Sequence, residues 1–295
     1  MTRVAVTGAS GFVGRYVLAA LAKTSVEVVA HACTPRADEP VRASPPWSYF
    51  DIAEAPEHCF ERLGRPDIVI HLAWNGLPNF TAPRHFENEL PVQSHFLRGL
   101  IESGLPRLVV VGTCLEYGMQ SGCLNEDMTA LPANPYGLAK DALRRELQFI
   151  GAMTPFDLRW LRVFYLYGKG QAPSSLYSQF HAAMARGDKW FDMSPGDQLR
   201  DFLRVEEAAA AIVDVALARE APRVLNVCSG KPTTVRRLVE QWRADTGADI
   251  ELKFGVYPYP TYEPFAFWGD NSRLNMLRGG AAAGSQCVHR SFGMA

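Results

Sequence analysis

Short runs of apolar residues alternate with longer amphipathic stretches along most of this chain. The apolar runs have the length of buried strands, and the amphipathic stretches repeat their apolar positions every three to four residues, as surface helices do. The strands are predicted at residues 4–6, 26–30, 67–73, 108–111, 158–164 and 224–228. The helices are predicted at residues 15–23, 87–103, 135–150, 174–186, 206–218 and 233–243. Such alternation is typical of an α/β fold with a parallel sheet.

A turn with three glycines joins the first predicted strand to the first predicted helix. Gly8, Gly11 and Gly14 follow the spacing G-x-x-G-x-x-G. In a dinucleotide-binding turn the glycines permit a tight turn, a close approach to pyrophosphate, and close packing of the helix on the strand. The free N–H groups at the start of the helix then face the anion. A glycine-rich loop without a ligand is the alternative interpretation.

Composition excludes several classes of protein. A length of 295 residues predicts one large domain or a domain with a smaller lobe. The net charge of −1 gives no reason to expect nucleic acid or an anionic membrane as a partner. No apolar run reaches the roughly 18 residues of a membrane span, and no signal peptide is evident, so we expect a cytoplasmic protein. The six cysteines and seven histidines lack C-x-x-C and H-E-x-x-H spacing, which favours reduced thiols and no metal site.

A tyrosine and a lysine near the start of a predicted helix could perform proton transfer. Tyr136 and Lys140 are four residues apart, so their side chains share one helix face. An ammonium nearby lowers the pKa of a phenol from about 10 towards neutral pH. Thr113 follows an earlier strand and can hydrogen-bond a substrate oxygen. Y-x-x-x-K is a short motif, and Tyr165 with Lys169 also matches it, but that pair falls in a glycine-containing loop.

Five motifs, in this order, resemble those of the extended short-chain dehydrogenase/reductase family. They are the glycine turn at residues 7–14, His71-Leu72-Ala73, residues 112–118 with Thr113 before a Tyr-Gly pair, Tyr136 with Lys140, and residues 197–205 with Arg200. The resemblance extends to about Trp268 and implies a doubly wound parallel sheet with a smaller substrate lobe. It implies a dinucleotide-binding domain at residues 1–165, rejoined by residues 205–228. The substrate lobe would then comprise residues 166–204 and 229–295.

The resemblance also implies the residues that bind the cofactor and perform catalysis. Thr113, Tyr136 and Lys140 take the positions of the catalytic residues. The residues expected to bind the dinucleotide are Gly8, Gly11, Phe12, Val13, Gly14, His31, Arg36, Asp51, Ile52, Leu72, Ala73 and Phe164, together with Tyr136 and Lys140. Among these, Asp51 would lie near the adenine and Phe164 near the nicotinamide.

The end of the second predicted strand indicates which dinucleotide is used. A NAD-selective fold places Asp or Glu there, to bond the ribose hydroxyls. This chain has His31 instead, and Arg36 follows a few residues later. A cation suits the extra phosphate of NADP, so we predict NADP as the cofactor and leave NAD possible. Both residues could also be ordinary surface side chains.

The remaining motifs imply a nucleotide-sugar substrate. Arg200 takes the place of the arginine that holds the diphosphate in the family, although an ion pair with Asp197 or Asp201 is the alternative. Tyr165 replaces an asparagine that is usual in the family. The expected substrate-binding residues are Asn75, Thr113, Glu116, Tyr136, Tyr165, Arg200 and Glu263, of which Asn75, Glu116 and Glu263 are candidates for the sugar hydroxyls.

The residues after Thr113 narrow the chemistry that the resemblance implies. The family's dehydratases have Asp-Glu there, whereas this chain has Cys114 and Leu115, so dehydration is not expected. NADP favours net reduction, and the best match is to reductases of nucleotide-linked 4-keto-6-deoxy sugars, with dTDP as the favoured nucleotide. A 4-epimerase with tightly bound NAD and a non-catalytic NADP-binding regulator are the alternatives. A homodimer formed through the helices at 87–103 and around Tyr136 is a family expectation.

Overall fold

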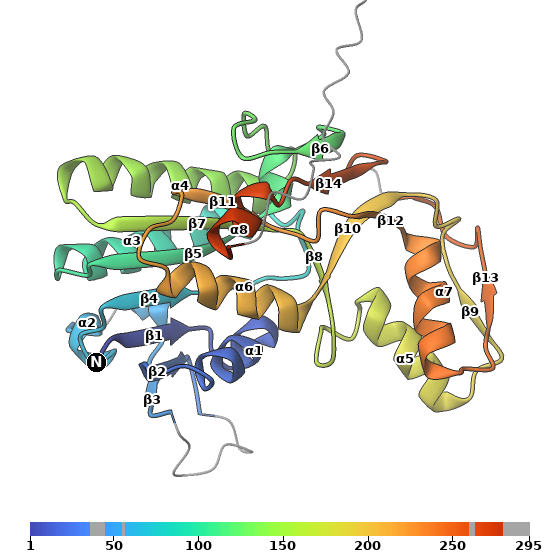
Figure 1. Cartoon of the computed structure of the whole chain (residues 1–295), viewed down its shortest axis with the longest axis horizontal. Coiled ribbons are helices and arrows are strands. Elements are labelled where there is room, and N and C mark those ends of the chain that lie inside the picture. The colour runs from blue at the N-terminus through green and yellow to red at the C-terminus, as the bar shows by residue number, and fades with distance from the viewer. Residues whose placement is uncertain (36–44, 55–56, 260–262, 280–295) are drawn as a thin grey trace, which may run out of the picture.

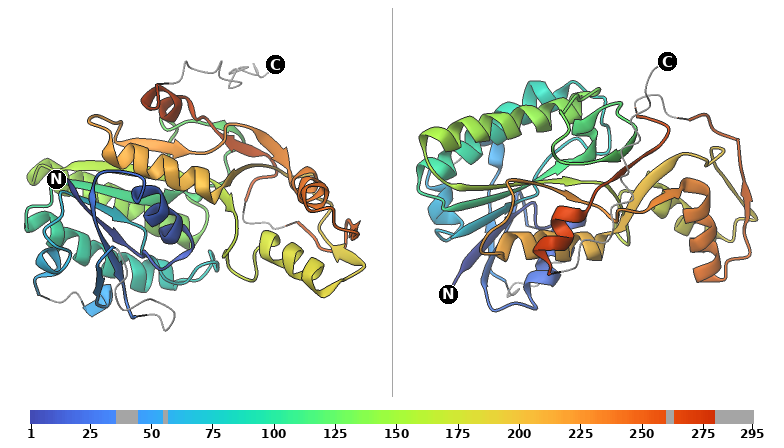
Figure 2. Two further views of the ribbon diagram at one scale, coloured as in Figure 1. Left: turned by 60° about the horizontal axis from the view of Figure 1, so that its bottom comes forward. Right: turned by 45° about the horizontal axis from the view of Figure 1, so that its top comes forward.

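The computed structural model describes residues 1–35, 45–54, 57–259 and 263–279. Arg36, which is expected near a cofactor phosphate, lies outside these residues. A large parallel sheet lies between two layers of helices, and a smaller lobe lies beyond the carboxyl ends of its strands (Figures 1 and 2). The predicted α/β fold with a doubly wound parallel sheet is confirmed.

The main sheet has seven parallel strands in the order β11-β7-β5-β4-β1-β2-β3. These strands are β1 (Arg3–Thr7), β2 (Glu27–Ala32), β3 (Trp47–Tyr49), β4 (Ile68–His71), β5 (Arg107–Thr113), β7 (Asp157–Val163) and β11 (Val224–Val227). The chain starts at β1, adds β2 and β3 on one side, and then adds β4 and its neighbours on the other. The order therefore reverses between β1 and β4, which is where doubly wound sheets bind their ligands.

The helices and the smaller sheets complete the described elements. The helices are α1 (Phe12–Leu21), α2 (Cys59–Arg62), α3 (Leu90–Glu102), α4 (Pro135–Met153), α5 (Leu176–Arg186), α6 (Val205–Leu217), α7 (Val235–Thr246) and α8 (Ser272–Leu277), with the single turns η1 (Ile52–Glu54), η2 (His85–Glu89) and η3 (Cys114–Tyr117). The short strands are β6 (Gly122–Leu124), β8 (Tyr165–Tyr167), β9 (Trp190–Asp192), β10 (Leu199–Arg204), β12 (Pro232–Thr234), β13 (Glu251–Lys253) and β14 (Phe267–Gly269).

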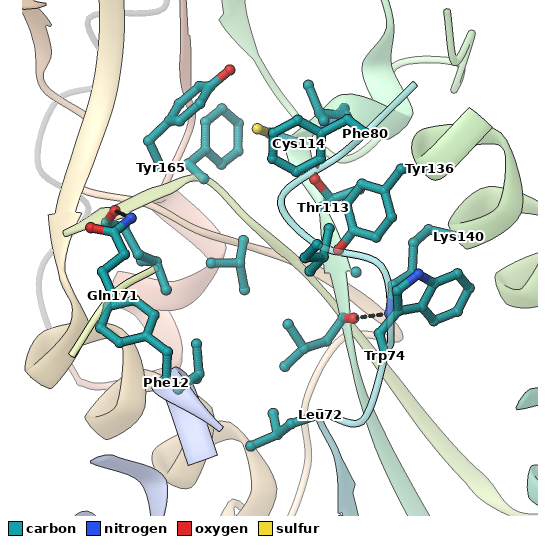
Figure 3. Close-up of a pocket in the computed structure, with 18 residues that line it drawn as sticks. Phe12, Leu72, Trp74, Phe80, Thr113, Cys114, Tyr136, Lys140, Tyr165 and Gln171 are labelled. Carbon is teal, nitrogen blue, oxygen red and sulfur yellow. Dashed lines mark hydrogen bonds between the residues drawn. The ribbon is translucent and has the colours of Figure 1, made fainter. Parts of the chain in front are cut away.

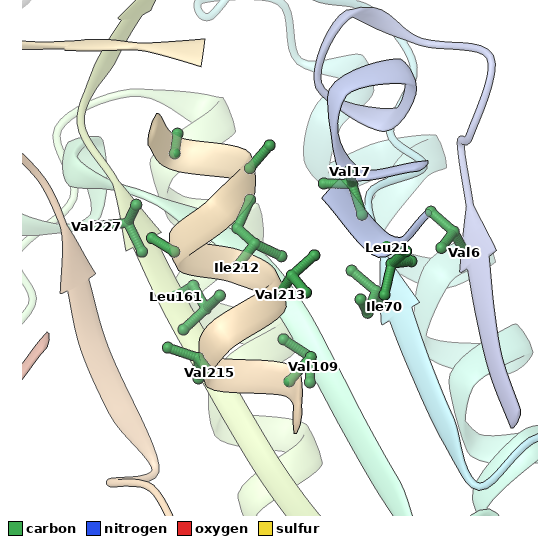
Figure 4. Close-up of a cluster of buried hydrophobic side chains, with 14 of the residues drawn as sticks. Val6, Val17, Leu21, Ile70, Val109, Leu161, Ile212, Val213, Val215 and Val227 are labelled. Atoms are coloured by element: carbon green, nitrogen blue, oxygen red, sulfur yellow. The ribbon is translucent and has the colours of Figure 1, made fainter. Parts of the chain in front are cut away.

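Successive residues of the central strands face opposite sides of the sheet, and helices cover both sides. Helices α1 and α6 bury one core, which includes Val17 and Ile212 (Figure 4). Helices α3 and α4 bury a second core on the other side. In β5, Val109 belongs to the first core and Val110 to the second. Burying one such side chain contributes about 1.5–3 kcal/mol, so the two cores fix where the strand ends lie.

The smaller lobe is assembled from segments that are distant in sequence. Its core joins helices α5 and α7 to the two-stranded sheet of β9 and β13, with Phe180 and Trp242 near its centre. Strand β8 follows β7 and pairs with β10, which in turn pairs with β12. This three-stranded sheet links the lobe to the main sheet, beside the carboxyl ends of its strands.

The last described helix returns to the main sheet. Leu274 of α8 is buried in the core that α1 and α6 cover. The resemblance places residues 229–295 in the substrate lobe, so α8 departs from that division. Residues 205–228 lie with the main sheet, because α6 covers it and β11 forms its edge. The exact border between the two lobes stays a prediction.

Two further expectations concern the membrane and the cysteines. Within the described part of the chain, no helix is both long and apolar enough to span a membrane. Cys33, Cys59, Cys114 and Cys228 are free thiols, as a reduced protein requires. Cys123 is disulfide-bonded, which the expectation of reduced thiols did not include.

Candidate active site

The glycine turn has the geometry that a dinucleotide site needs. Gly8 has a φ of 69°, and a Cβ there would come within 2.7 Å of the backbone nitrogen of Ala73 at the end of β4. A Cβ on Gly14 would lie 2.3 Å from the carbonyl oxygen of Gly8. Helix α1 starts after Gly11, and no side chain caps its first turn. The turn is therefore a backbone cradle with N–H groups directed outward, which fits the pyrophosphate of a dinucleotide.

A cavity of about 270 Å³ opens beside this turn, between the carboxyl ends of the main strands and the smaller lobe. The predicted site residues that line it are Phe12, Val13, Leu72, Thr113, Tyr136, Lys140, Phe164 and Tyr165. In Figure 3, Thr113, Tyr136 and Lys140 lie together on one side, and Phe12, Gln171 and Tyr165 face them from the other. The predicted proximity of the three catalytic candidates is therefore present in the structure.

Helix α4 places Tyr136 and Lys140 in the wall of this cavity. The side chain of Asn134 caps the helix by accepting a hydrogen bond from the backbone N–H of Gly137 at 2.9 Å. The backbone N–H of Tyr136 donates to the carbonyl of Phe80. Lys140 Nζ donates to the carbonyl oxygen of Val111 in β5 at 2.9 Å. Both ends of the Y-x-x-x-K motif are thereby fixed against neighbouring segments.

The loop after β4 packs three rings against Tyr136. The ring centres of Trp74, Phe80 and His85 lie 5.9, 5.6 and 5.2 Å from that of Tyr136. Trp74 Nε1 donates to Nδ1 of His85 at 3.0 Å, and the other ring nitrogen of His85 lies 2.7 Å from the carbonyl oxygen of Asn79. This pairing fixes the indole of Trp74, which lines the cavity. The sequence did not single out Trp74 or His85, although Trp74 follows a strand at the ligand-binding edge of the sheet.

Burial sets the protonation of Tyr136 and Lys140. It lowers the pKa of Lys140 to about 7, although Glu116 and Glu89 favour the charged form. Burial also raises the pKa of Tyr136 above its usual value, and the negative charge of Glu116 adds to this effect. The sequence analysis predicts that Lys140 lowers the pKa of Tyr136, and the structure shows the opposite direction. The phenol is therefore protonated at neutral pH, as a proton donor must be.

Thr113 lies at the start of η3, where its side-chain oxygen and its backbone N–H each form a hydrogen bond. Its Oγ1 accepts the N–H of Leu115 at 3.2 Å, and its own N–H donates to Glu116 Oε1 at 2.9 Å. Because the oxygen already accepts a bond, the hydroxyl hydrogen can donate into the cavity. Glu116 is completely buried and also accepts from Trp160 and Arg162. Glu116 therefore cannot reach sugar hydroxyls, and that prediction is wrong.

Three other substrate candidates, Tyr165, Arg200 and Glu263, contact one another, and Tyr165 lines the cavity. Arg200 Nη2 lies 2.9 Å from Glu263 Oε1, and the hydroxyl of Tyr165 hydrogen-bonds to the same carboxylate. Arg200 also donates to the carbonyl oxygens of Leu199 and Phe265. Burial raises the pKa of Glu263, whereas the adjacent guanidinium favours its charged form. Arg200 thus forms its ion pair with Glu263, whereas the alternative expectation was a pair with Asp197 or Asp201. Diphosphate binding by Arg200 stays a prediction.

His31 lies inside the protein and not at a phosphate site. His31 is 2% exposed, its ring centre lies 4.1 Å from that of Phe50 with the rings tilted by 50°, and its Nε2 hydrogen-bonds to the carbonyl of Phe50. Burial lowers the pKa of His31 to about 4, so the ring is neutral at physiological pH. The prediction that His31 supplies a cation to NADP is therefore wrong. The sequence could not show this, because Phe50 reaches His31 from the neighbouring strand.

The remaining predicted residues are placed as follows. Asp51 accepts the N–H of Ala53, so its carboxylate caps the turn η1, and Ile52 is buried in the second core. Asn75 is exposed and lies outside the cavity lining, which gives no support to its contact with a sugar. Among the described residues, no cluster of His, Cys, Asp or Glu could hold a metal ion.

Known proteins resemble this chain in sequence and in fold. The model of the NAD dependent epimerase/dehydratase family matches residues 4–228. The dTDP-6-deoxy-L-talose 4-dehydrogenase (NAD(+)) of Aggregatibacter actinomycetemcomitans is 30% identical over 270 residues, which are 90% of this chain and 98% of that protein. The dTDP-6-deoxy-L-talose 4-dehydrogenase (NAD(P)(+)) of Kitasatospora kifunensis is 29% identical over 262 residues, covering 85% of this chain and 81% of that protein.

A solved structure gives the same result for the fold. MoeE5 in complex with UDP-glucuronic acid and NAD is 26% identical, with a TM-score of 0.79 over 95% of this chain and 93% of that one. The relatives of known activity include nucleotide-sugar 4-dehydrogenases, reductases and epimerases. These matches confirm the resemblance inferred from the motifs: the chain belongs to the NAD-dependent epimerase/dehydratase family of nucleotide-sugar enzymes.

Proposed function

We propose that this protein reduces the 4-keto group of a nucleotide-linked 4-keto-6-deoxyhexose, with a dTDP-sugar as the favoured substrate. The observation that carries the proposal is the grouping of Thr113, Tyr136 and Lys140 in one cavity beside the glycine turn. Two relatives are named as 4-dehydrogenases of a dTDP-linked 6-deoxy sugar, and the reverse of such a reaction is a 4-keto reduction.

The side chains of the cavity suit the proton chemistry of that reduction. A reduced nicotinamide dinucleotide supplies the hydride when it is bound. The Thr113 hydroxyl donates a hydrogen bond to the carbonyl oxygen as that oxygen gains negative charge. Tyr136 then transfers its phenolic proton to the same oxygen, and Lys140 supports the resulting phenolate with its ammonium. The protonated phenol and the free hydroxyl hydrogen of Thr113 are both suited to this direction of reaction.

The residues after Thr113 support reduction without loss of water. Dehydration at C5 and C6 needs an acid and a base next to the sugar, and this wall of the cavity has Cys114 and Leu115 instead. Burial raises the pKa of the Cys114 thiol well above its usual value, so the thiol stays neutral. We therefore propose a reductase, not a dehydratase.

The choice of dinucleotide is a separate part of the proposal. We propose NADPH as the preferred reductant, and with His31 buried the preference depends on Arg36, which lies outside the described residues. The ratio of kcat/KM for NADPH to that for NADH, measured for the wild type and for Arg36→Ala, tests it. A wild-type ratio of one or less would make NADH an equal or better reductant, and a ratio that Arg36→Ala leaves unchanged would show that Arg36 does not set the preference.

A panel of 4-keto-6-deoxy sugars linked to dTDP, GDP or CDP tests the activity itself. The oxidation of NADPH or NADH is followed at 340 nm with each sugar, and the product is identified by NMR. We expect stoichiometric oxidation with one nucleotide strongly preferred. Epimerisation of a 4-hydroxy sugar by protein that was purified with bound NAD, without consumption of added reductant, would favour a 4-epimerase. Binding of NADP without any turnover would favour a regulator.

Assembly and location complete the proposal. We propose a homodimer formed through α3 and α4, because α4 exposes 48% of Leu138, 74% of Phe149 and 78% of Met153. Light scattering of the purified protein and of Phe149→Glu tests this, with a monomeric wild type as the contrary result. A cytoplasmic location, where nucleotide sugars and reduced dinucleotides are made, is proposed with it.

A further inference from the structure

Glu116 is the only one of the predicted substrate-binding residues that is completely buried. Both of its carboxylate oxygens accept hydrogen bonds. Oε1 accepts the backbone N–H of Thr113 at 2.9 Å and the indole N–H of Trp160 at 2.9 Å. Oε2 accepts Arg162 Nε at 2.8 Å. Three donors from two neighbouring strands, Thr113 of β5 and Trp160 and Arg162 of β7, thus hold one carboxylate directly behind the backbone of a cavity residue.

The neighbouring backbone leaves room for this arrangement. A Cβ on Gly112 would lie 2.2 Å from Trp160 Nε1 and 2.4 Å from Glu116 Oε1. Any larger residue before Thr113 would therefore displace either the indole or the carboxylate. The glycine, the tryptophan and the glutamate form one packed unit, which fixes the direction in which the chain enters η3.

Charged groups extend this unit towards helix α4. Arg144 Nε, one turn after Lys140, lies 4.0 Å from Glu116 Oε2 and is held by Asp141 at 3.0 Å. The titratable groups that face Lys140 from other elements are Glu116 on η3, Glu89 on η2 and His71 on β4. Glu89 already accepts from Asn75 and Arg84, and burial keeps His71 neutral. Lys140 Nζ donates to the carbonyl of Val111, and Glu116 accepts the N–H of Thr113 two residues further along β5, so the ammonium and this carboxylate are held against the same stretch of strand.

We propose that Glu116 is a positioning residue that aims the hydroxyl of Thr113 into the cavity and stabilises the ammonium form of Lys140. The inference rests on the proposed function in so far as Thr113 and Lys140 act on the substrate. Through the hydrogen bond to its N–H, Glu116 fixes the backbone of Thr113. Through its charge, it offsets part of the cost of burying an ammonium, and Coulomb interactions in a buried site are weakly screened.

The variant Glu116→Gln separates charge from shape. Its amide oxygen can still accept from Thr113 and Trp160, while its NH2 group replaces the oxygen that accepts from Arg162, so the negative charge and that one acceptor are removed. Glu126→Gln is the matched control, because the side chain of Glu126 is only 3% exposed, accepts the backbone N–H of Asn226 at 2.8 Å and lies 3.6 Å from Arg273. Glu126 lies outside the lining of the cavity. Arg162→Met combined with Glu116→Gln removes the cation together with its partner, in case the single variant fails to fold.

Two measurements decide the outcome, and the first needs no substrate. The titration of Lys140 is followed by NMR in protein with carbon-13 at the lysine Cε, with the signal assigned by Lys140→Met. We expect Glu116→Gln to lower the pKa of Lys140 by about one unit, a tenfold change in the ammonium equilibrium. The double variant should lower it less, because the positive charge of Arg162 is removed as well. Glu126→Gln should leave the titration unchanged.

The second measurement follows turnover with the sugar that the wild type reduces. We expect kcat of the folded Glu116→Gln protein to fall about 10- to 100-fold, with KM for the dinucleotide changed less than about 3-fold. A folded variant with the Lys140 titration and kcat of the wild type would overturn the proposal. If the wild type reduces no 4-keto sugar, the proposed function fails, and the titration still supports or refutes the role of Glu116.

Discussion

The ammonium nitrogen of Lys140 lies 4.0 Å from the centre of the Trp74 ring. A cation over an indole face gains about 0.5–2 kcal/mol, more as water is excluded. Lys140 is 2% exposed and its pKa is lowered to about 7, so the ring compensates part of the lost hydration. The hydrogen bond from Trp74 to His85 holds the ring in this position.

Replacing Trp74 should therefore change the protonation of Lys140. Trp74→Leu keeps the site apolar but removes the ring, so we expect the pKa of Lys140 to fall by up to about one unit and kcat at pH 7 to fall up to about tenfold. Trp74→Phe keeps a ring and should retain most of the activity. The pH dependence of kcat for both variants measures the effect. Equal profiles for the two variants would show that the ring has no electrostatic role.

Removing the phenolic hydroxyl should stop turnover and leave binding intact. Tyr136→Phe keeps the ring that packs against Trp74, Phe80 and His85, so the protein should fold and bind the dinucleotide normally. General acid catalysis contributes about 10²–10⁴-fold, and we expect kcat to fall by at least that much. Single-turnover kinetics and dinucleotide titration measure the two quantities. Near-normal turnover would remove Tyr136 from the mechanism.

The second Y-x-x-x-K match provides a comparison for this prediction. Tyr165 lines the same cavity, and its hydroxyl contacts Glu263, which holds Arg200. Tyr165→Phe should therefore raise KM for the nucleotide sugar and lower kcat far less than Tyr136→Phe. If Tyr165→Phe instead abolishes turnover, the assignment of the two tyrosines must be exchanged.

The residues whose positions in the structure match the sequence-based expectation are those fixed by local spacing. Gly8, Gly14, Tyr136 and Lys140 act within one turn or one helix, so their geometry follows from short-range rules. Thr113 could be placed because it ends a strand, and parallel strands end at one edge of a sheet. The fold class followed for the same reason, since alternating strand and helix periods leave few arrangements.

The residues that the sequence misjudged are those whose role depends on distant neighbours. Glu116 could not be identified as buried without Trp160 and Arg162, which come from another strand. The environment of His31 is set by Phe50, which directly follows the neighbouring strand β3. No periodic pattern reports such contacts, because polar residues at strand ends look alike whether they face solvent or the core.

A methyl group in the glycine cradle should abolish dinucleotide binding. The Cβ of Gly14→Ala would lie 2.3 Å from the carbonyl oxygen of Gly8 and 2.7 Å from the Cα of Ala9, which are backbone atoms that cannot move aside without shifting the turn. We expect the dissociation constant for the dinucleotide to rise at least about tenfold, with a loss of stability of about 1–3 kcal/mol from overpacking. Gly99→Ala in α3 is the control, since its Cβ meets no atom within 4 Å. That change should be neutral or stabilising by up to about 1 kcal/mol. Equal affinity in Gly14→Ala and the wild type would place the pyrophosphate elsewhere.

Acid should destabilise the protein through its buried histidines. Burial lowers the pKa of His31 to about 4 and that of His71 to about 3, against 6.5 for an exposed imidazole. Between pH 6.5 and these lower values, the unfolded chain binds a proton that the folded protein does not. The free energy of unfolding therefore falls as pH falls in this range, by about 1.4 kcal/mol per pH unit for each histidine. Above pH 6.5 both states are neutral and the full stability is present.

The variant His31→Gln isolates one of these two contributions. Its amide can still donate to the carbonyl of Phe50, but it does not titrate. Urea unfolding at pH 7 and pH 5 should show a loss of stability that is about 2 kcal/mol smaller in His31→Gln than in the wild type. His58→Gln is the control, because the side chain of His58 is 76% exposed and its loss should leave the pH dependence unchanged. If His31→Gln and the wild type lose the same free energy between these pH values, His31 is not buried in its neutral form, and the NADP phosphate would again have a cation available at the end of β2.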